Sequence, residues 1–257
     1  MRYFISLSYR GSSYCGWQIQ ISQASVQAEL ERAFSIYLGN ETGITGAGRT
    51  DAGVNAINYI AHFDSANPIL VQDYPKLIYK INAILPSDIT LHDICQVACD
   101  AHARFDAVSR TYKYFIHTKK DSFLNQYSYF FPYEINIEKM NMAAVSLLGE
   151  RDFTSMAKLH TDVKTNICTV TEALWTPESP MNISLINSSF CFTISANRFL
   201  RNMVRAVVGS LLDVGRGKQE PEWIADILEQ KNRCAAGSSV PAHPLFLTGI
   251  EYPYRIF

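Results

Sequence analysis

The chain has 257 residues, of which 47% are hydrophobic and 18% are charged, and its formal net charge is −1 at pH 7. This composition is typical of a globular protein with one large domain or two small ones, and it argues against indiscriminate binding to polyanions. The first residues, MRYFISLSYRG, lack the apolar core of a signal peptide, and no apolar run approaches the roughly 18 residues of a membrane span. We therefore expect a cytoplasmic protein without a membrane segment.

The first half of the chain alternates between the strand period and the helix period. The expected strands are residues 3–9, 57–63 and 89–97, and the expected helices are 25–38 and 74–85. The strand over 57–63 places four side chains on one face: Ile57, Tyr59, Ala61 and Phe63. The first helix has a buried stripe at helical spacing: Val26, Leu30, Ala33, Phe34 and Tyr37.

The second half repeats this order of elements. Strands are expected over residues 110–117 and 168–175, and a hairpin over 183–195 turns at Asn187-Ser188-Ser189. Helices are expected at residues 138–148, at 199–215 and from Pro221 onward.

This order of strands and helices predicts an α+β fold of two similar, ferredoxin-like halves with mainly antiparallel sheets. The expected domains are residues 1–105, with the glycine-rich loop, and residues 106–257, with the Tyr112 strand and a basic helix. The two halves share no residue identities that align, so the repeat rests on the pattern alone.

The cysteines and histidines show no metal-site pattern. The six cysteines include no CxxC pair, and the six histidines form neither HExxH nor a cluster. We therefore expect reduced thiols and no bound metal.

The stretch GAGRTDAGVNA, Gly46 to Ala56, is the most distinctive part of the sequence. Its glycines permit a turn whose backbone approaches a ligand closely, and Arg49 and Asp51 are its only charged side chains. It matches neither GxxxxGK[ST] nor GxGxxG, and no GxSxG is present. Asp51 is therefore either a nucleophile or general base held ionised by positive charge, or an aspartate that only stabilises its turn.

Local charge is concentrated in residues 198–218. Five basic residues and one acidic residue, Asp213, give this segment a charge of +4; the basic ones are Arg198, Arg201, Arg205, Arg216 and Lys218. Such a segment is either a solvated face or a phosphate-binding surface. On the expected helix, Arg201 and Arg205 are four residues apart and share a face, where they would bind phosphate or pair with a carboxylate. Tyr112 is either half of the core or a platform on which a base stacks.

Together these pieces resemble the TruA-type tRNA pseudouridine synthases. The blocks that carry the resemblance occur in that family's order and spacing from about Tyr3 to Tyr254: LSYRGSSYCGWQIQ, GAGRTDAGVNA, HARFDAVSRTYKYFI, LLGERDFTSM, NRFLRNMVRAVVGSLLDVGRGK and AAGSSVPAHPLFLTGIEYP. The resemblance implies two α+β halves around a central catalytic cleft, a homodimer, no cofactor, and a tRNA substrate modified at uridines 38 to 40 of the anticodon stem-loop.

The resemblance also implies roles for particular residues. Asp51 matches the catalytic aspartate, which acts after base flipping. Arg49 matches an arginine that holds the target nucleotide out of the stack, and Tyr112 matches a tyrosine that packs on the uracil. Arg205 matches the basic partner of the aspartate, and Leu245 lies where a leucine lines the pocket.

Two positions depart from the family's usual pattern. Asn55 stands where histidine is common, and Pro244 stands where glycine is common. Asn55 bears on loop packing more than on catalysis, whereas Pro244 fixes φ beside Leu245.

Two other classes of function are open from the residues. A non-catalytic RNA-binding protein would not need an aspartate facing a polyanion. A glycoside hydrolase would need a second carboxyl group beside Asp51, and the motifs show none.

Overall fold

The structure is a computed structural model that describes residues 1–158, 165–180 and 188–257. The chain divides into two compact units. Unit 1 comprises Met1–Ser109 and Leu247–Phe257, and unit 2 comprises Arg110–Phe246. The end of the chain thus groups with unit 1, and the division into domains 1–105 and 106–257 stays a prediction.

Residues 1–108 of unit 1 contain four strands and two α-helices in the order β1 (Arg2–Tyr9), α1 (Val26–Leu38), β2 (Ile44–Gly46), β3 (Asn55–Asp64), α2 (Tyr74–Ile84) and β4 (Ile89–Val97). β1 pairs antiparallel with β3 and β4, and β2 pairs antiparallel with β3, so the strand order is β4-β1-β3-β2. The hydroxyl of Ser25 caps α1 by accepting from the Ala28 N–H, and Gly39 ends it with φ 75°. The predicted helix over 25–38 is confirmed.

Both helices of unit 1 pack on one face of β1 and β3. On that face Tyr3 and Phe63 stack with their ring centroids 5.4 Å apart. Phe63 also packs against Phe34 of α1, and Tyr3 meets the edge of Tyr74 of α2. The side chains that the alternation predicted as one apolar face therefore form the helix-covered core.

The opposite face of these strands is also buried, which a half-buried alternation did not predict. Phe4 and Ile60 cluster there with Ala101 and Ala103, and Tyr252 from the end of the chain packs against them. The expectation for Ile57 was wrong, since its side chain is 55% exposed. The register of β1 against β3 shifts between Leu7 and Tyr9, opposite this part of β3.

Unit 2 holds β5 (Ser109–His117), which begins at the unit boundary, followed by β6 (Tyr129–Phe130), α3 (Ile137–Ala144), β7 (Gly149–Asp152), β8 (Ile167–Pro177), β9 (Ser189–Ala196), α4 (Met203–Gly215) and α5 (Trp223–Gln230). The strand order is β5-β9-β8-β7, with antiparallel pairs, and β6 pairs parallel with β5. β10 (Leu245–Glu251) begins in unit 2 and ends in unit 1. Part of the predicted hairpin over 183–195 lies outside the described residues.

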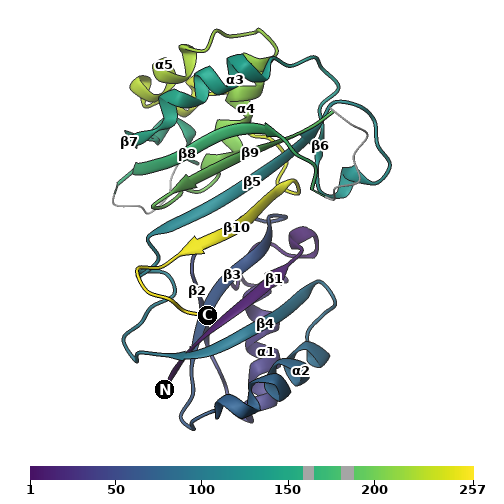
Figure 1. The fold of residues 1–257 in the computed structure, drawn as a ribbon, viewed down its shortest axis with the longest axis vertical. Coiled ribbons are helices and arrows are strands. Elements are labelled where there is room, and N and C mark those ends of the chain that lie inside the picture. Colours follow the sequence, from purple (N-terminus) through teal and green to yellow (C-terminus); the bar gives the residue numbers. More distant parts are fainter. Residues whose placement is uncertain (159–164, 181–187) are drawn as a thin grey trace. The chain divides into compact units, whose positions relative to one another are not determined.

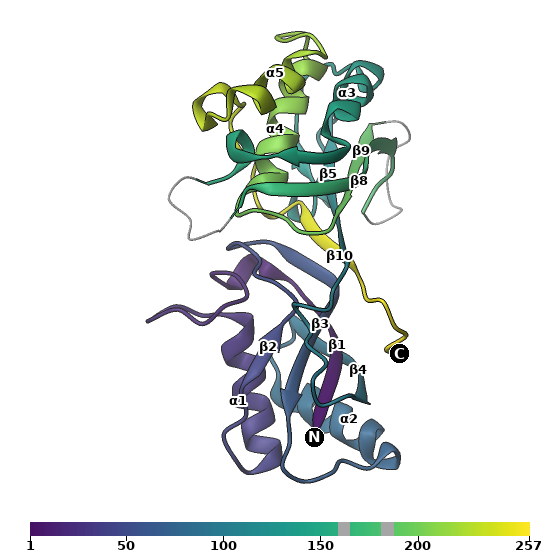
Figure 2. The same ribbon diagram turned by 90° about the vertical axis from the view of Figure 1, so that its left-hand side faces the viewer.

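In the described part of unit 2, α3, α4 and α5 lie on the same side of the sheet, as Figure 1 and Figure 2 both show. α3 contacts α4, α5 and β8, and the side chain of Asn141 bonds to both the N–H and the carbonyl of Trp175. α4 is buried around nearly its whole circumference. In the described ranges, no helix is long and apolar enough to cross a bilayer.

The chain is therefore a mixed α/β protein whose strand pairs are mainly antiparallel. In the described residues, β5–β6 is the parallel exception among the pairs given above. The ferredoxin-like arrangement of two similar halves around a cleft stays a prediction.

Candidate active site

Asp51 lies in the loop of residues 47–54 that joins β2 to β3 in unit 1. Its side chain is half-buried, between the buried Thr50 and the exposed Ala52, and Arg49 is exposed. Both charged side chains of the loop thus lie at or near the surface, whereas the polar side chain of Thr50 between them is buried. This is the disposition expected of a carboxylate that must reach a bound molecule.

Three aromatic residues hold the first part of this loop. The Tyr9 hydroxyl and the Thr50 hydroxyl are hydrogen-bonded at 2.8 Å in a buried position, and the Tyr59 hydroxyl donates to the Gly48 carbonyl. The Trp17 N–H donates to the Thr50 carbonyl at 3.3 Å, and its ring stacks on Tyr59 at 4.2 Å. The backbone on either side of Arg49 is therefore fixed by neutral groups.

The segment of residues 9–17 packs its backbone closely against the backbone of the aspartate loop. Gly16 has φ +95°, and a Cβ there would overlap the Thr50 carbonyl oxygen; a Cβ at Gly11 would overlap that of Val54. Only glycine satisfies both the conformation and the space at Gly16. The LSYRGSSYCGW block is thus the support of the aspartate loop.

Two further contacts join this segment to the loop. The Asn55 side-chain oxygen accepts from the Gly11 N–H at 2.9 Å, and the Tyr14 carbonyl accepts from the Gly53 N–H at 3.3 Å. Asn55 is buried, so its departure from the family pattern concerns loop packing, as the sequence predicted. The Tyr14 hydroxyl donates to Asp88 at 2.6 Å; burial and then this bond raise the pKa of Tyr14 and keep it protonated.

Arg205 lies in the first turns of α4 in unit 2. Its Nε donates to the Val240 carbonyl at 2.7 Å, and the Val240 N–H donates to the Arg205 carbonyl at 3.2 Å. The Tyr114 hydroxyl donates to the next carbonyl, that of Pro241, at 3.0 Å. The guanidinium is therefore held against the chain segment that leads into β10.

Tyr112 and Leu245 also belong to unit 2. Tyr112 lies on β5, where it meets the ring of Phe199 edge-on at 5.0 Å. Leu245 opens β10 and is buried, and its N–H donates to the Ala242 carbonyl. The Pro244 carbonyl accepts from the Phe115 N–H at 3.2 Å, so the proline at this position still joins the segment to β5.

The predicted pairing of Arg201 and Arg205 on one helix face was wrong. α4 begins at Met203, and the preceding Asn202 is left-handed with φ 66°, so Arg201 lies before the helix. A left-handed residue breaks the helical spacing that a four-residue separation assumes. The apolar stripe extends N-terminal to the helix, since Leu200 is also buried, and this blurred the predicted boundary.

The basic residues of 198–218 differ in their surroundings. Arg201 is exposed and Arg198 is half-buried. Lys218 pairs with Asp213 at 2.9 Å, and the Arg216 guanidinium lies 3.7 Å from the centre of the Tyr133 ring. Lys218 and Arg216 are therefore already engaged within unit 2.

The structure brings some of the predicted residues together within a unit. Asp51 and Arg49 share one loop in unit 1; all the others lie in unit 2: Tyr112, Arg198, Arg201, Arg205, Arg216, Lys218 and Leu245. Sequence reasoning missed the residues that support the aspartate loop, namely Tyr9, Trp17 and Tyr59. The glycines of YRGSSYCGW were the available signal for these residues.

Among residues 1–158, 165–180 and 188–257, no group of three or more His, Cys, Asp or Glu side chains is arranged to hold a metal ion. Burial raises the thiol pKa values of the two buried cysteines in these ranges, Cys168 and Cys191, to about 11 and about 12. These thiols are protonated near neutral pH and are poor nucleophiles.

The chain is similar to known proteins along its whole length. A family model described as tRNA pseudouridine synthase matches residues 143–253. The chain is 50% identical to tRNA pseudouridine synthase A of Bacteroides fragilis, over 100% of this chain and 98% of that protein. The chain belongs to the tRNA pseudouridine synthase A family. The proteins of that name from Bacteroides thetaiotaomicron and Bacillus subtilis are 49% and 37% identical, over 100% and 98% of this chain and 92% and 99% of their own lengths.

Proposed function

We propose that this protein isomerises uridine to pseudouridine in tRNA, with Asp51 as the nucleophile. Family membership supports the reaction and the substrate class. The assignment of Asp51 rests on the structure of the aspartate loop. Neutral groups hydrogen-bond to the loop on either side of Arg49, while the Asp51 side chain is only half-buried. A carboxylate held on a rigid backbone reaches a reacting atom with little loss of orientation.

The reaction suits these groups. The bond from uracil N1 to ribose C1′ breaks, the base turns, and C5 bonds to the same carbon, with no net oxidation, reduction or hydrolysis. A carboxylate nucleophile meets this need by attacking either C1′ or C6 of the ring, and both routes fit the residues present. No step calls for a cofactor.

The remaining residues take the roles that the family resemblance implies. Arg49 is exposed beside Asp51 and holds the target nucleotide outside the stack. Tyr112 packs on the uracil and Leu245 lines the pocket. Arg205 is the cationic partner of Asp51, because a carboxylate that becomes enclosed by a substrate is stabilised by a positive partner.

The uridines of the anticodon stem-loop, at positions 38 to 40, are the proposed targets. A base in a stem must be extruded at a cost of a few kcal/mol, which phosphate contacts and aromatic stacking offset. The basic residues of 198–218 supply the phosphate contacts in this proposal. We propose a homodimer on family grounds, and a cytoplasmic location as expected from the sequence.

The test is incubation of purified protein with unmodified tRNA, followed by mapping of pseudouridine at nucleotide resolution, in parallel with and without EDTA. We expect pseudouridine to form in the anticodon stem-loop at equal rates in both samples. Magnesium is added back to the EDTA sample only in the amount that the tRNA needs to fold. No pseudouridine in any tRNA would contradict the function. Activity lost in EDTA and restored by zinc, with the tRNA still folded, would contradict metal independence.

A further inference from the structure

The segment of residues 236–240 in unit 2, called the 236–240 segment below, lies directly against α4. A Cβ added at Gly209 would overlap the Ser238 carbonyl oxygen. The Gly237 N–H donates to the buried Ser210 hydroxyl at 3.0 Å. At Gly209 the segment and the helix therefore touch backbone to backbone, with no side chain at that contact to absorb a displacement.

This segment sets the orientation of the Arg205 guanidinium. Nε of Arg205 donates to the Val240 carbonyl at 2.7 Å. Because Nε, Cζ and the two NH2 groups of a guanidinium are coplanar, one bond from Nε restrains the plane of the whole fork. The position of the Val240 carbonyl therefore sets the direction in which the two NH2 groups of Arg205 point. These are the groups that can bind a carboxylate in a bidentate manner.

Arg233 holds the 236–240 segment in place. Its Nη1 donates to the carbonyls of Gly237 at 3.1 Å and Ala236 at 3.4 Å, and its Nη2 donates to the Ser239 hydroxyl at 3.0 Å. The Ser239 oxygen also accepts from the Asn202 side chain at 2.6 Å, directly before the first residue of α4. One half-buried guanidinium thus bonds to three residues of the segment, Ala236, Gly237 and Ser239.

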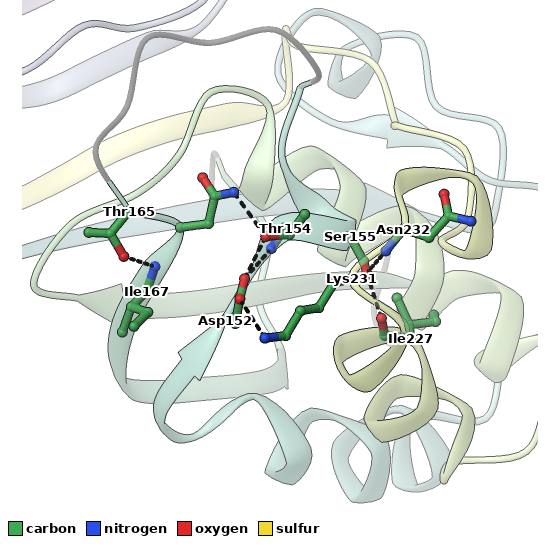
Figure 3. Close-up of polar contacts among 9 residues, drawn as sticks. Asp152, Thr154, Ser155, Thr165, Ile167, Ile227, Lys231 and Asn232 are labelled. Atoms are coloured by element: carbon green, nitrogen blue, oxygen red, sulfur yellow. Dashed lines mark hydrogen bonds and ion pairs between the residues drawn. The ribbon is translucent and has the colours of Figure 1, made fainter.

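The base of Arg233 is anchored by the LLGERDFTSM block (Figure 3). The Asn232 N–H donates to the buried Ser155 hydroxyl at 2.8 Å, and that hydroxyl donates to the Ile227 carbonyl at 2.6 Å. Lys231, left-handed with φ 47°, pairs with Asp152 at 3.2 Å. This block contributes no group to the proposed chemistry. Its contacts instead hold the residues directly before Arg233.

We propose that Arg233 is a positioning residue for pseudouridine formation, acting through the 236–240 segment on the guanidinium of Arg205. This inference rests on the proposed function, because the role of Arg205 as partner of Asp51 belongs to it. Arg233 touches no reacting atom. Its loss leaves Arg205 present and charged but lets the Val240 carbonyl, and with it the guanidinium plane, change direction.

The test is a double-mutant cycle of wild type, Arg205→Met, Arg233→Met and the double variant. Single-turnover pseudouridine formation on unmodified tRNA, tRNA affinity and urea unfolding are measured for each. Misplacement of a group at a site costs on the order of tenfold to a hundredfold in rate, so Arg233→Met should slow the reaction about that much with tRNA affinity within about twofold. In the Arg205→Met background the same substitution should slow it no further.

Arg151→Met is the matched control, since Arg151 is an exposed arginine of unit 2 whose side chain donates to the carbonyl of its neighbour Glu150. It should leave the rate unchanged. Should Arg233→Met not fold, Ser239→Ala removes one acceptor and keeps the guanidinium. It should slow the reaction less than Arg233→Met is expected to, and again only when Arg205 is present.

Equal slowing in both backgrounds, or a loss of stability at an unchanged rate, would overturn this inference and leave the proposed function intact. A wild-type protein that forms no pseudouridine would overturn the proposed function, and this inference with it.

Discussion

Two short segments present the two charged groups of the proposed chemistry, and they are held in different ways. Residues 47–54 in unit 1 carry Asp51, and the 236–240 segment in unit 2 directs Arg205. Each lies against a glycine whose Cβ would overlap a carbonyl oxygen of the segment, Gly16 for the first and Gly209 for the second. The first is then fixed by neutral hydroxyls and backbone groups, whereas the second is fixed by the guanidinium of Arg233.

The difference teaches that the two groups are vulnerable to different changes. Asp51 is placed mainly by shape, because its loop packs against aromatic side chains and makes close backbone contacts with Gly11 and Gly16. Arg205 is placed mainly by hydrogen bonds that converge on one side chain. A steric substitution should therefore disturb the first segment most, and removal of a donor should disturb the second.

Gly16→Ala should have the largest effect on unit 1. An alanine at φ +95° is strained, and its Cβ would overlap the Thr50 carbonyl oxygen, so we expect a loss of well over about 1 kcal/mol in the free energy of unfolding and a severe loss of activity. Gly43→Ala is the control, since a Cβ there meets nothing within 4 Å. Urea unfolding at pH 7 measures both, and equal stabilities would show that shape does not place the loop.

Acid should weaken unit 1 through His62, on the strand β3 that follows the aspartate loop. Burial, and then the charge of Arg2, lower the pKa of His62 to about 4. The unfolded chain binds the proton near pH 6.5, so the stability due to this lowered pKa is complete above about 6.5 and is lost as pH falls toward 4. The loss between pH 7 and pH 5 should be about 2 kcal/mol.

His62→Gln should remove this part of the pH dependence, and urea unfolding at the two pH values compares it with wild type. His92→Gln, at an exposed position of the same unit, should keep it. A His62→Gln protein with the wild-type loss between pH 7 and pH 5 would show that another group titrates instead.

The smallest effect concerns phosphate contacts in unit 2. tRNA affinity should fall steeply with salt, and Arg201→Ala should reduce the slope of log K against log salt by about 0.7 to 0.9. Lys218→Ala should also reduce it, because Lys218 can exchange its contact with Asp213 for a phosphate. Filter binding over a range of salt measures both slopes; a flat response in the wild type would remove these residues from the interface.

The sequence predicted most elements and the aspartate loop, because period, caps and glycines are local signals. The helix over 25–38 has its cap at Ser25 and its end at Gly39 as the pattern required. The start of α4 was missed because Leu200 continues the apolar stripe past the left-handed Asn202. The burial of Ile60 and His62 was missed because the residues that cover them, Ala103 and Tyr252, are distant in sequence.

The supporting roles in the candidate site were hidden for two different reasons. The contact of Tyr9 with Thr50 joins residues 41 positions apart, so no local pattern shows it. The guanidinium of Arg233 reaches Gly237 and Ser239 nearby in the sequence, but these residues lie in an irregular segment with no helix or strand period that would predict the bonds. The family resemblance supplied the residues proposed to touch substrate, whereas the folded chain determines the residues that hold them.

The most direct test of the account is Asp51→Asn, assayed on the mapped uridine of an unmodified tRNA. The amide keeps the size of the side chain but is no nucleophile, so pseudouridine formation should be abolished, with tRNA affinity within about tenfold of wild type, about 1.4 kcal/mol. Asp93→Asn, an exposed aspartate of the same unit, should react at the wild-type rate. Retention of more than about a few per cent of wild-type activity by Asp51→Asn would contradict the assignment of the nucleophile.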